Sequence, residues 1–258
     1  MPPTTHRPAT VHAKALRLCF ICLIVSFASS PPPLPAAGPP ADLLKRVLQH
    51  ETELETERSH YAYRQKVRIE ELDVNGRLRG EYRETRDIIF TPEGKRIEEM
   101  AGKPYQTLDR LRLTEEDFRD IREVQPFLFT SDQLFLYQTT FKGEETMDGI
   151  PCWVLQVRPR QILEGQRLFD GLVWVSQAEL TVIRLEGQAV PQILGRKQEN
   201  LFPRFTTIRG KVDGVHWFPT LTFADDILQF RTGGLRIRMR IEYTKYERFH
   251  ADSKITYK

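Results

Sequence analysis

The sequence predicts a mainly β protein of the α+β class, in which one large, curved antiparallel sheet forms an incomplete barrel and one or two helices cover its concave face. Three observations support this prediction. An amphipathic helical pattern is followed by a strand in which apolar and polar residues alternate. Turn signals then recur at strand-like intervals along the chain. The alternation also leaves one face of the strands charged, which is typical of an antiparallel sheet covered on one side only.

The composition is that of a folded protein with no net charge in its main part. The chain has 258 residues, of which 40% are hydrophobic and 28% are charged. Its 38 basic residues outnumber its 35 acidic residues, but three of the basic ones, Arg7, Lys14 and Arg17, lie in the first 30 residues, where no acidic residue occurs. The rest of the chain is therefore neutral, which argues against a nucleic-acid partner.

The first 28 residues have the pattern of a secretory signal peptide. A basic segment precedes an apolar run over 18–28, and this run is shorter than the roughly 20 residues that a membrane-spanning helix needs. Small residues at Ser26 and Ala28 predict cleavage before Ser29, so we expect export to the periplasm without a stable transmembrane anchor. An uncleaved N-terminal anchor is the alternative. A proline-rich spacer over 29–40 and a single domain over 41–258 complete the expected organisation.

The folded part is expected to open with a helix over 42–54, because Leu44, Val47, Leu48 and Leu54 form one apolar stripe. The period then changes to two from Tyr61, which predicts a half-buried strand. Further strands are expected at 77–90, 95–101, 134–142, 151–158, 166–176, 180–190, 203–211, 215–224, 226–232 and 235–249.

Glycine-containing dipeptides mark the expected hairpin turns: Asn75-Gly76, Asp148-Gly149, Asp213-Gly214 and Gly233-Gly234. A capping-box pattern at Thr114 to Asp117 predicts a short helix that ends near Pro126. The adjacent pair Asp225-Asp226 is interpreted as a turn or helix-cap feature rather than as an acid/base pair, because neighbouring residues on a strand point to opposite faces.

The sequence contains none of the common phosphate-binding, serine-hydrolase or zinc-protease motifs. Its histidines after the leader, His50, His60, His216 and His250, fall on four different expected elements, so their spacing predicts no metal site. Cys152 is the single cysteine after the leader and is interpreted as a small core residue. We therefore expect no catalytic activity, no cofactor and no bound metal.

Aromatic and aliphatic side chains on the expected strands could do more than fill a core. A curved sheet with a helical cover can enclose an apolar cavity for a lipid or acyl chain. Simple core packing is the alternative explanation for the same residues. The expected cavity residues are Val67, Ile69, Trp153, Leu155, Trp174, Ile183, Trp217 and Phe223.

Several motifs resemble the LolA/LolB/RseB superfamily of periplasmic lipoprotein-handling proteins. A helix followed by an aromatic-x-Gln strand, here Tyr63-Arg64-Gln65, is similar to the start of their mature domains. The runs over 142–159, 171–176 and 182–187 resemble those of the outer-membrane lipoprotein-sorting type. The resemblance implies a half-barrel with an acyl-chain cavity. One departure is that Thr91 precedes Pro92 where LolA-type carriers have an arginine, so no functional arginine is transferred to this chain.

Three functions compete on this evidence. The first is a periplasmic carrier or sensor that binds lipids or lipoprotein acyl chains. The second is an envelope interaction or structural module with a filled core. Its basic ridge, either Arg236, Arg238 and Arg240 or Arg64, Lys66 and Arg68, contacts an acidic protein partner or anionic head groups. The third is a hydrolase in which separated histidines converge in the fold. The sequence favours the first and leaves the ligand unidentified.

Overall fold

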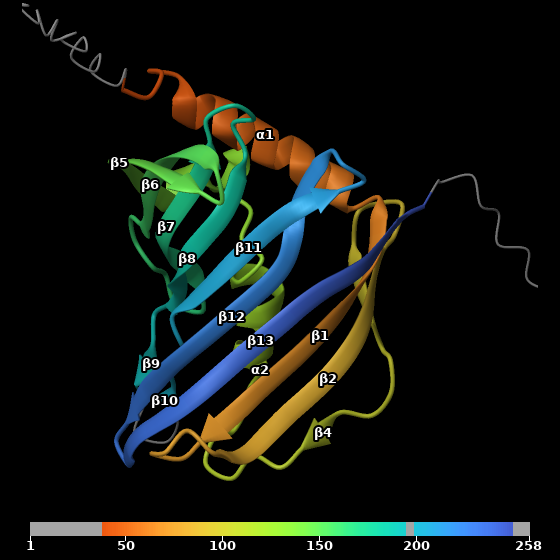
Figure 1. Cartoon of the computed structure of the whole chain (residues 1–258), viewed down its shortest axis with the longest axis vertical. Coiled ribbons are helices and arrows are strands. Elements are labelled where there is room, and N and C mark those ends of the chain that lie inside the picture. Colours follow the sequence, from red (N-terminus) through yellow and green to blue (C-terminus); the bar gives the residue numbers. More distant parts are fainter. Residues whose placement is uncertain (1–37, 195–198, 250–258) are drawn as a thin grey trace, which may run out of the picture. The chain divides into compact units, whose positions relative to one another are not determined.

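Eleven strands of the chain form one antiparallel sheet that is not closed (Figure 1). The computed structural model describes residues 38–194 and 199–249, and the expected signal peptide and most of the spacer lie outside them. The strand order is β3-β2-β1-β13-β12-β11-β8-β7-β6-β5, with β4 paired to β2. The strands are β1 (Tyr61–Leu72), β2 (Leu78–Phe90), β3 (Arg96–Met100), β4 (Tyr105–Gln106), β5 (Tyr137–Met147), β6 (Ile150–Pro159), β7 (Leu168–Ser176), β8 (Val182–Val190), β11 (Phe205–Val212), β12 (His216–Phe230) and β13 (Gly233–Arg248).

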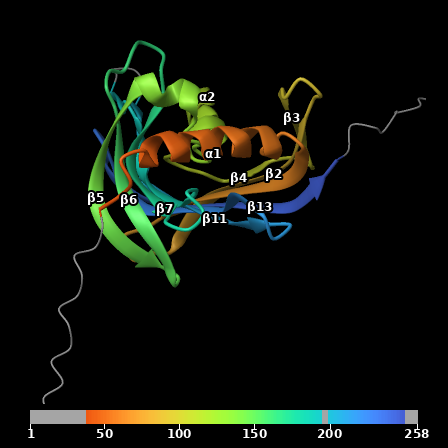
Figure 2. The ribbon, with the colours of Figure 1, turned by 90° about the horizontal axis from the view of Figure 1, so that it is seen from above.

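The helices lie in the hollow of this curved sheet, between the β5–β6 side and the β2–β3 side (Figure 2). They are α1 (Leu43–Arg58), α2 (Glu115–Arg119), a π-helix η1 (Asp120–Val124) and a 3-10 helix η2 (Ser131–Leu136). Two short strands, β9 (Ile193–Leu194) and β10 (Glu199–Asn200), pair with each other separately. The predicted fold class, an open antiparallel sheet with helices on its concave side, is confirmed. No helix in the described ranges has both the length and the apolar character to span a membrane.

The residues of β1 alternate between apolar and polar because the apolar side chains all lie on the face of the sheet that the helices cover. Tyr61, Tyr63, Gln65, Val67 and Ile69 are buried as predicted, while the residues between them are half-buried or exposed. On β13 the inward residues from Leu235 to Tyr243 are likewise buried, and the arginines between them are exposed. Alternation with one side facing the helices therefore accounts for both strands.

Two hairpins turn on Asp-Gly pairs in which both residues have positive φ. The values are 50° and 83° for Asp148 and Gly149, and 51° and 70° for Asp213 and Gly214. Such backbone angles suit a two-residue hairpin turn, whose twist matches that of the flanking strands. The predicted turns at these two sites are confirmed.

The predicted helix near the start is present and extends four residues further than expected, to Arg58. Val47, Leu48 and Leu54 of its predicted stripe are buried, together with Leu43. The predicted capping box is also present: Thr114 accepts from the backbone of Asp117, whose carboxylate accepts from the backbone of Thr114. Both helices thus begin where the sequence pattern places them.

The predicted boundary at Asp225-Asp226 is wrong. The segments 215–224 and 226–232 were expected to be separate strands around a turn at Asp225-Asp226, but they form the continuous strand β12. The Asp225 carboxylate accepts hydrogen bonds from Arg236 at 3.0 Å and from Arg238 at 3.2 Å, both on the neighbouring β13. Cross-strand partners therefore stabilise an aspartate that in isolation favours turns.

The outer strands of the sheet, β3 and β5, are not paired with each other. β5 is irregular, because its register against β6 shifts between Phe141 and Gly143, and Gly143 has a φ of 139°. Nearby, the Arg160 guanidinium donates from Nε to the carbonyl oxygen of Tyr137 at 2.7 Å. The pairing of this edge strand is therefore interrupted near its middle.

Candidate functional site

The eight expected cavity residues lie on both faces of the sheet and do not line one cavity. Val67, Ile69, Trp153 and Leu155 belong to the main core beneath the helices. Trp174 and Ile183 belong to a second apolar cluster, against which Trp217 packs. Phe223 is 38% exposed, on the face opposite to its buried neighbour Ala224. The expectation that all eight share one interior is corrected by this placement.

A bulge explains part of this difference. The register between β7 and β8 shifts where Trp174 pairs with Arg184 and Val175 pairs with Val182, so that Ile183 is the extra residue. Val182 therefore faces the main core, while Ile183 joins the cluster on the other face. A simple alternation cannot assign such a residue to a face.

The interior beneath the helices is closely packed around Phe127 and Met239. Phe127 stacks on Phe169 with ring centroids 4.8 Å apart, and both belong to the main core. The void that borders Ile69, Leu111 and Met239 has a volume of only about 20 Å³. A void of this size has room for about one water molecule, so it cannot accept an acyl chain in the conformation described.

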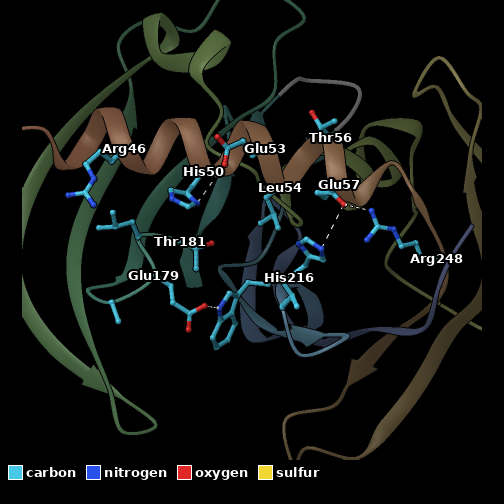
Figure 3. Close-up of a pocket in the computed structure, with 14 residues that line it drawn as sticks. Arg46, His50, Glu53, Leu54, Thr56, Glu57, Glu179, Thr181, His216 and Arg248 are labelled. Atoms are coloured by element: carbon cyan, nitrogen blue, oxygen red, sulfur yellow. Dashed lines mark hydrogen bonds and ion pairs between the residues drawn. The ribbon is translucent and has the colours of Figure 1, made fainter. Parts of the chain in front are cut away.

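A much larger groove of about 890 Å³ runs beside α1 (Figure 3). One wall is α1 itself, and the other comes from the β7–β8 turn and the β11–β12 hairpin. Figure 3 shows Arg46 near one end of the groove and Arg248 near the other. The lining residues are Arg46, His50, Glu53, Leu54, Thr56, Glu57, Ala178, Glu179, Leu180, Thr181, Val215, His216, Trp217 and Arg248.

An apolar strip lies among the charged residues of this groove. It includes Leu54 from the helix, Leu180 from the β7–β8 turn, and Val215 and Trp217 from the β11–β12 hairpin. Val215 is 63% exposed, so the strip faces solvent in part. Charged side chains border the strip on both walls, which distinguishes it from the hydrophobic core.

Hydrogen bonds hold the Trp217 ring in position. Its indole Nε1 donates to Glu179 at 2.9 Å, and Lys211 lies 2.9 Å from the same side chain. Burial would raise the pKa of Glu179, but the bonds from Trp217 and Lys211 lower this pKa below its ordinary value. Glu179 therefore stays charged at neutral pH and remains an acceptor for the indole.

Glu57 links three elements at the other end of the groove. Its carboxylate lies 3.1 Å from Arg248 on β13 and 3.8 Å from His216 on β12. His60, which follows the helix, is also 3.8 Å from this carboxylate. Two of the four histidines considered in the sequence thus meet at one glutamate. His50 lies elsewhere on α1, and His250 lies outside the described residues.

These groups do not form a recognisable catalytic arrangement. Within 38–194 and 199–249, no group of three or more His, Cys, Asp or Glu side chains is placed to hold a metal ion. Cys152 is buried, and burial raises the pKa of its thiol. The thiol is therefore protonated at neutral pH, which makes it a poor nucleophile.

The basic ridge on β13 is compensated by neighbouring carboxylates. Arg236 and Arg238 share Asp225, and the Arg240 guanidinium lies 2.9 Å from Glu242. The Arg236 hydrogen bond lowers the pKa of Asp225 below its ordinary value despite partial burial, so the carboxylate is charged at neutral pH. The ridge thus carries less net charge than its three arginines suggest.

The groove and the buried ion pair between Glu51 and Arg209 were not predicted from the sequence. Glu51 on α1 and Arg209 on β11 are both fully buried and form an ion pair. Charged residues in amphipathic elements ordinarily indicate the solvent face, so the sequence carried no signal for this pair. Trp217 was selected from the sequence, but it lies in the groove wall rather than in the interior.

Comparison with protein-family models finds no match, and comparison with curated protein sequences finds none either. Among solved structures, a DUF1329 family protein from Desulfovibrio piger matches with 14% identity and a TM-score of 0.40, over 81% of this chain and 95% of that one. A LolA superfamily protein from Nitrosomonas europaea matches with 14% identity and a TM-score of 0.36, over 82% and 97%.

A putative outer-membrane lipoprotein-sorting protein domain from Vibrio parahaemolyticus matches with 12% identity and a TM-score of 0.40, over 82% of this chain and 94% of that one. The structures found therefore include the kinds of protein that the sequence motifs resemble. At these identities and TM-scores, the similarity carries no information about function. The evidence on function is the groove and the interior of this chain.

Proposed function

We propose that this chain is a non-catalytic binding protein of the bacterial periplasm, which holds the apolar part of a lipid or of an acylated polypeptide in the groove beside α1. The observation that carries this proposal is the difference in volume between the two candidate spaces. The groove has about 890 Å³, within the range of roughly 300–1,000 Å³ that is typical of small-ligand sites. The interior void beside Ile69 and Met239 has about 20 Å³.

The lining of the groove fits an amphipathic ligand. The strip that contains Leu54, Val215 and Trp217 offers apolar contact, and removing apolar surface from water contributes about 25 cal/mol per Å². Arg46 and Arg248 lie toward the two ends (Figure 3), where either could contact an anionic head group. Export by the N-terminal leader would bring the protein to the compartment in which such ligands occur.

Thermal unfolding of delipidated protein, with and without lysophospholipid below its micelle concentration, tests this proposal. Binding to the folded state should raise the unfolding midpoint saturably, equivalent to about 2.7 kcal/mol at a hundredfold excess over the dissociation constant. Trp217→Asp should abolish the shift. Phe223→Asp, a similar change on the face outside the groove, should retain it.

Circular dichroism would establish that both variants are folded. An absent shift in the wild-type protein would overturn lipid binding altogether. A shift that survives Trp217→Asp would overturn the groove as its location, and would instead indicate that the filled interior opens to admit the ligand.

A second function, an envelope interaction module without a lipid ligand, is favoured by one observation, the filled interior. A protein that must empty and refill a cavity gains nothing from stacked rings such as Phe127 and Phe169 in that place. This alternative predicts no lipid-induced shift in any variant. The same unfolding experiment therefore separates the two functions.

A further inference from the structure

Arg46 is the charged side chain of the groove beside α1 that has no hydrogen-bond or ion-pair partner among the described residues. Figure 3 shows it near one end of the groove. The carboxylates of the lining have cations of their own. Glu57 lies 3.1 Å from Arg248, and Glu179 lies 2.9 Å from Lys211. Arg46 is therefore available to an anion that enters the groove from solvent.

A third carboxylate, that of Glu53, also belongs to the groove and lies further along α1. It accepts a hydrogen bond from Gln49 at 3.0 Å and lies 4.0 Å from His50, so it too has partners. Because a helix rises 1.5 Å per residue, Glu53 is displaced from Arg46 by about 10 Å along the helix, and Leu54 of the apolar strip by about 12 Å. An anion at Arg46 thus avoids this carboxylate, while an uncharged chain attached to the anion can reach the strip.

The dipole of α1 does not stabilise Arg46. This residue lies in the first turn of the helix (Leu43–Arg58), and that turn contains no acidic residue. The N-terminal end of a helix carries a partial positive charge, which disfavours a cation nearby and favours an anion. The dipole therefore adds to the positive potential that the Arg46 guanidinium creates at this end of the groove.

The arginine at the other end of the groove is already occupied. Arg248 donates to the Glu57 carboxylate at 3.1 Å, and His216 and His60 each lie 3.8 Å from the same carboxylate. An anionic head group at Arg248 would have to displace Glu57 or approach it closely, and like charges at short range repel each other. The charges of the groove therefore favour an anion at Arg46 rather than at Arg248.

We infer that Arg46 is the head-group residue of this groove, and that the ligand is an anionic lipid whose phosphate or carboxylate binds there while its apolar chain lies along the strip that includes Leu54. This inference rests on the lipid binding proposed above, and adds the class of head group and the direction of the chain. An arginine can donate two parallel hydrogen bonds to a phosphate or a carboxylate. A neutral head group cannot form such a charge-assisted pair, so it should bind more weakly.

Two probes with chains of the same length test the inference, dodecyl phosphate and monolauroylglycerol, which differ in the charge of the head group. Titration calorimetry of delipidated protein, below the micelle concentration of each probe, measures both affinities. We expect dodecyl phosphate to bind about tenfold more tightly than monolauroylglycerol at low salt, and this preference to shrink as salt is added, because an exposed ion pair is screened. Inorganic phosphate should bind far more weakly than dodecyl phosphate, since it lacks the chain.

Two variants separate the role of Arg46 from a general effect of positive charge. Arg46→Gln should lower the affinity for dodecyl phosphate to that for monolauroylglycerol, and leave the affinity for monolauroylglycerol unchanged. Lys45→Gln removes the same charge from the neighbouring position, which is exposed and does not line the groove, so it should keep the wild-type preference. Both substitutions are at exposed positions of α1, and circular dichroism would establish that both variants are folded.

Equal affinities for the two probes in the wild-type protein would overturn the inference and leave lipid binding in place. So would a preference for dodecyl phosphate that survives Arg46→Gln, or one that is lost equally in Lys45→Gln. Inorganic phosphate that binds as tightly as dodecyl phosphate would show that the ligand is a free anion rather than a lipid. If neither lipid probe binds, the proposed function itself fails, and the role of Arg46 fails with it.

Discussion

The Glu51 carboxylate on α1 accepts two hydrogen bonds from the Arg209 guanidinium on β11, at 2.8 and 3.0 Å, and neither side chain is exposed to solvent. Both groups have further partners. Glu51 accepts from the backbone N–H of Val182 at 3.2 Å, and Arg209 donates to the carbonyl oxygen of Phe127 at 2.7 Å. The pair therefore connects the helix with two strands and with the segment that fills the core.

Removing one member of this pair should destabilise the protein strongly. Glu51→Met leaves an uncompensated buried guanidinium, so we expect the free energy of unfolding to fall by about 3–5 kcal/mol. The double variant Glu51→Met/Arg209→Met should recover most of that loss, because both desolvated charges are gone. Urea unfolding of the wild type, the two single variants and the double variant measures the coupling. Additive losses in the double variant would show that the pair is not coupled.

The apolar stripe of α1 should contribute to stability through burial. Leu48 is 3% exposed, and Leu48→Ala should lower the free energy of unfolding by about 2–5 kcal/mol. Lys45→Ala, at an exposed position of the same helix, should change it by less than about 0.5 kcal/mol. Denaturant titration at constant pH compares them. Equal effects at the two positions would contradict the packing of this stripe against the sheet.

The contribution of Asp225 should depend on pH. Its pKa is lowered in the folded protein by the Arg236 hydrogen bond, so the folded state favours the charged carboxylate. That stabilisation is present at neutral pH and is lost as pH falls below the unfolded-state value of about 3.9 and through the lower folded-state value. Asp225→Asn should therefore be less stable than the wild type at pH 7, and the difference should shrink as pH falls below about 3.9. A difference independent of pH would show that the charge is not responsible.

The expected signal peptide can be tested by mass. Protein recovered from the periplasm should begin near Ser29, because the apolar run over 18–28 is long enough for recognition and too short to span the membrane. Intact-mass measurement of native material identifies the first residue. Recovery of the full-length chain in membranes after a carbonate wash would instead indicate an uncleaved anchor.

Helices and strands were predicted correctly from the sequence where one face of the element is buried, because the apolar residues then recur with a regular period. The alternation from Tyr61 to Ile69 and the helical stripe through Leu48 were read correctly, since burial on one side imposes that period. The capping box at Thr114 was also predicted correctly, because its hydrogen bonds join residues only three positions apart. In each of these cases, neighbouring residues determine the structure.

The parts that could not be predicted depend on distant partners. Asp225 was interpreted as a turn residue because its arginine partners are on another strand. Ile183 faces away from the interior because of a bulge, and a bulge changes the face without changing the composition. The groove beside α1 forms only when two turns and a helix meet, so no local pattern could indicate it.

The irregular edge at β5 also bears on how the protein behaves at high concentration. A long, straight outer strand offers a template on which another chain can add its own backbone, which is the first step toward fibrils. Here the bulge at Gly143 interrupts the register, and the Arg160 side chain already occupies the Tyr137 carbonyl oxygen. The Arg160 contact at the start of β5 and the bulge near its middle therefore make this edge a poorer template for a second chain than a straight, unoccupied strand would be.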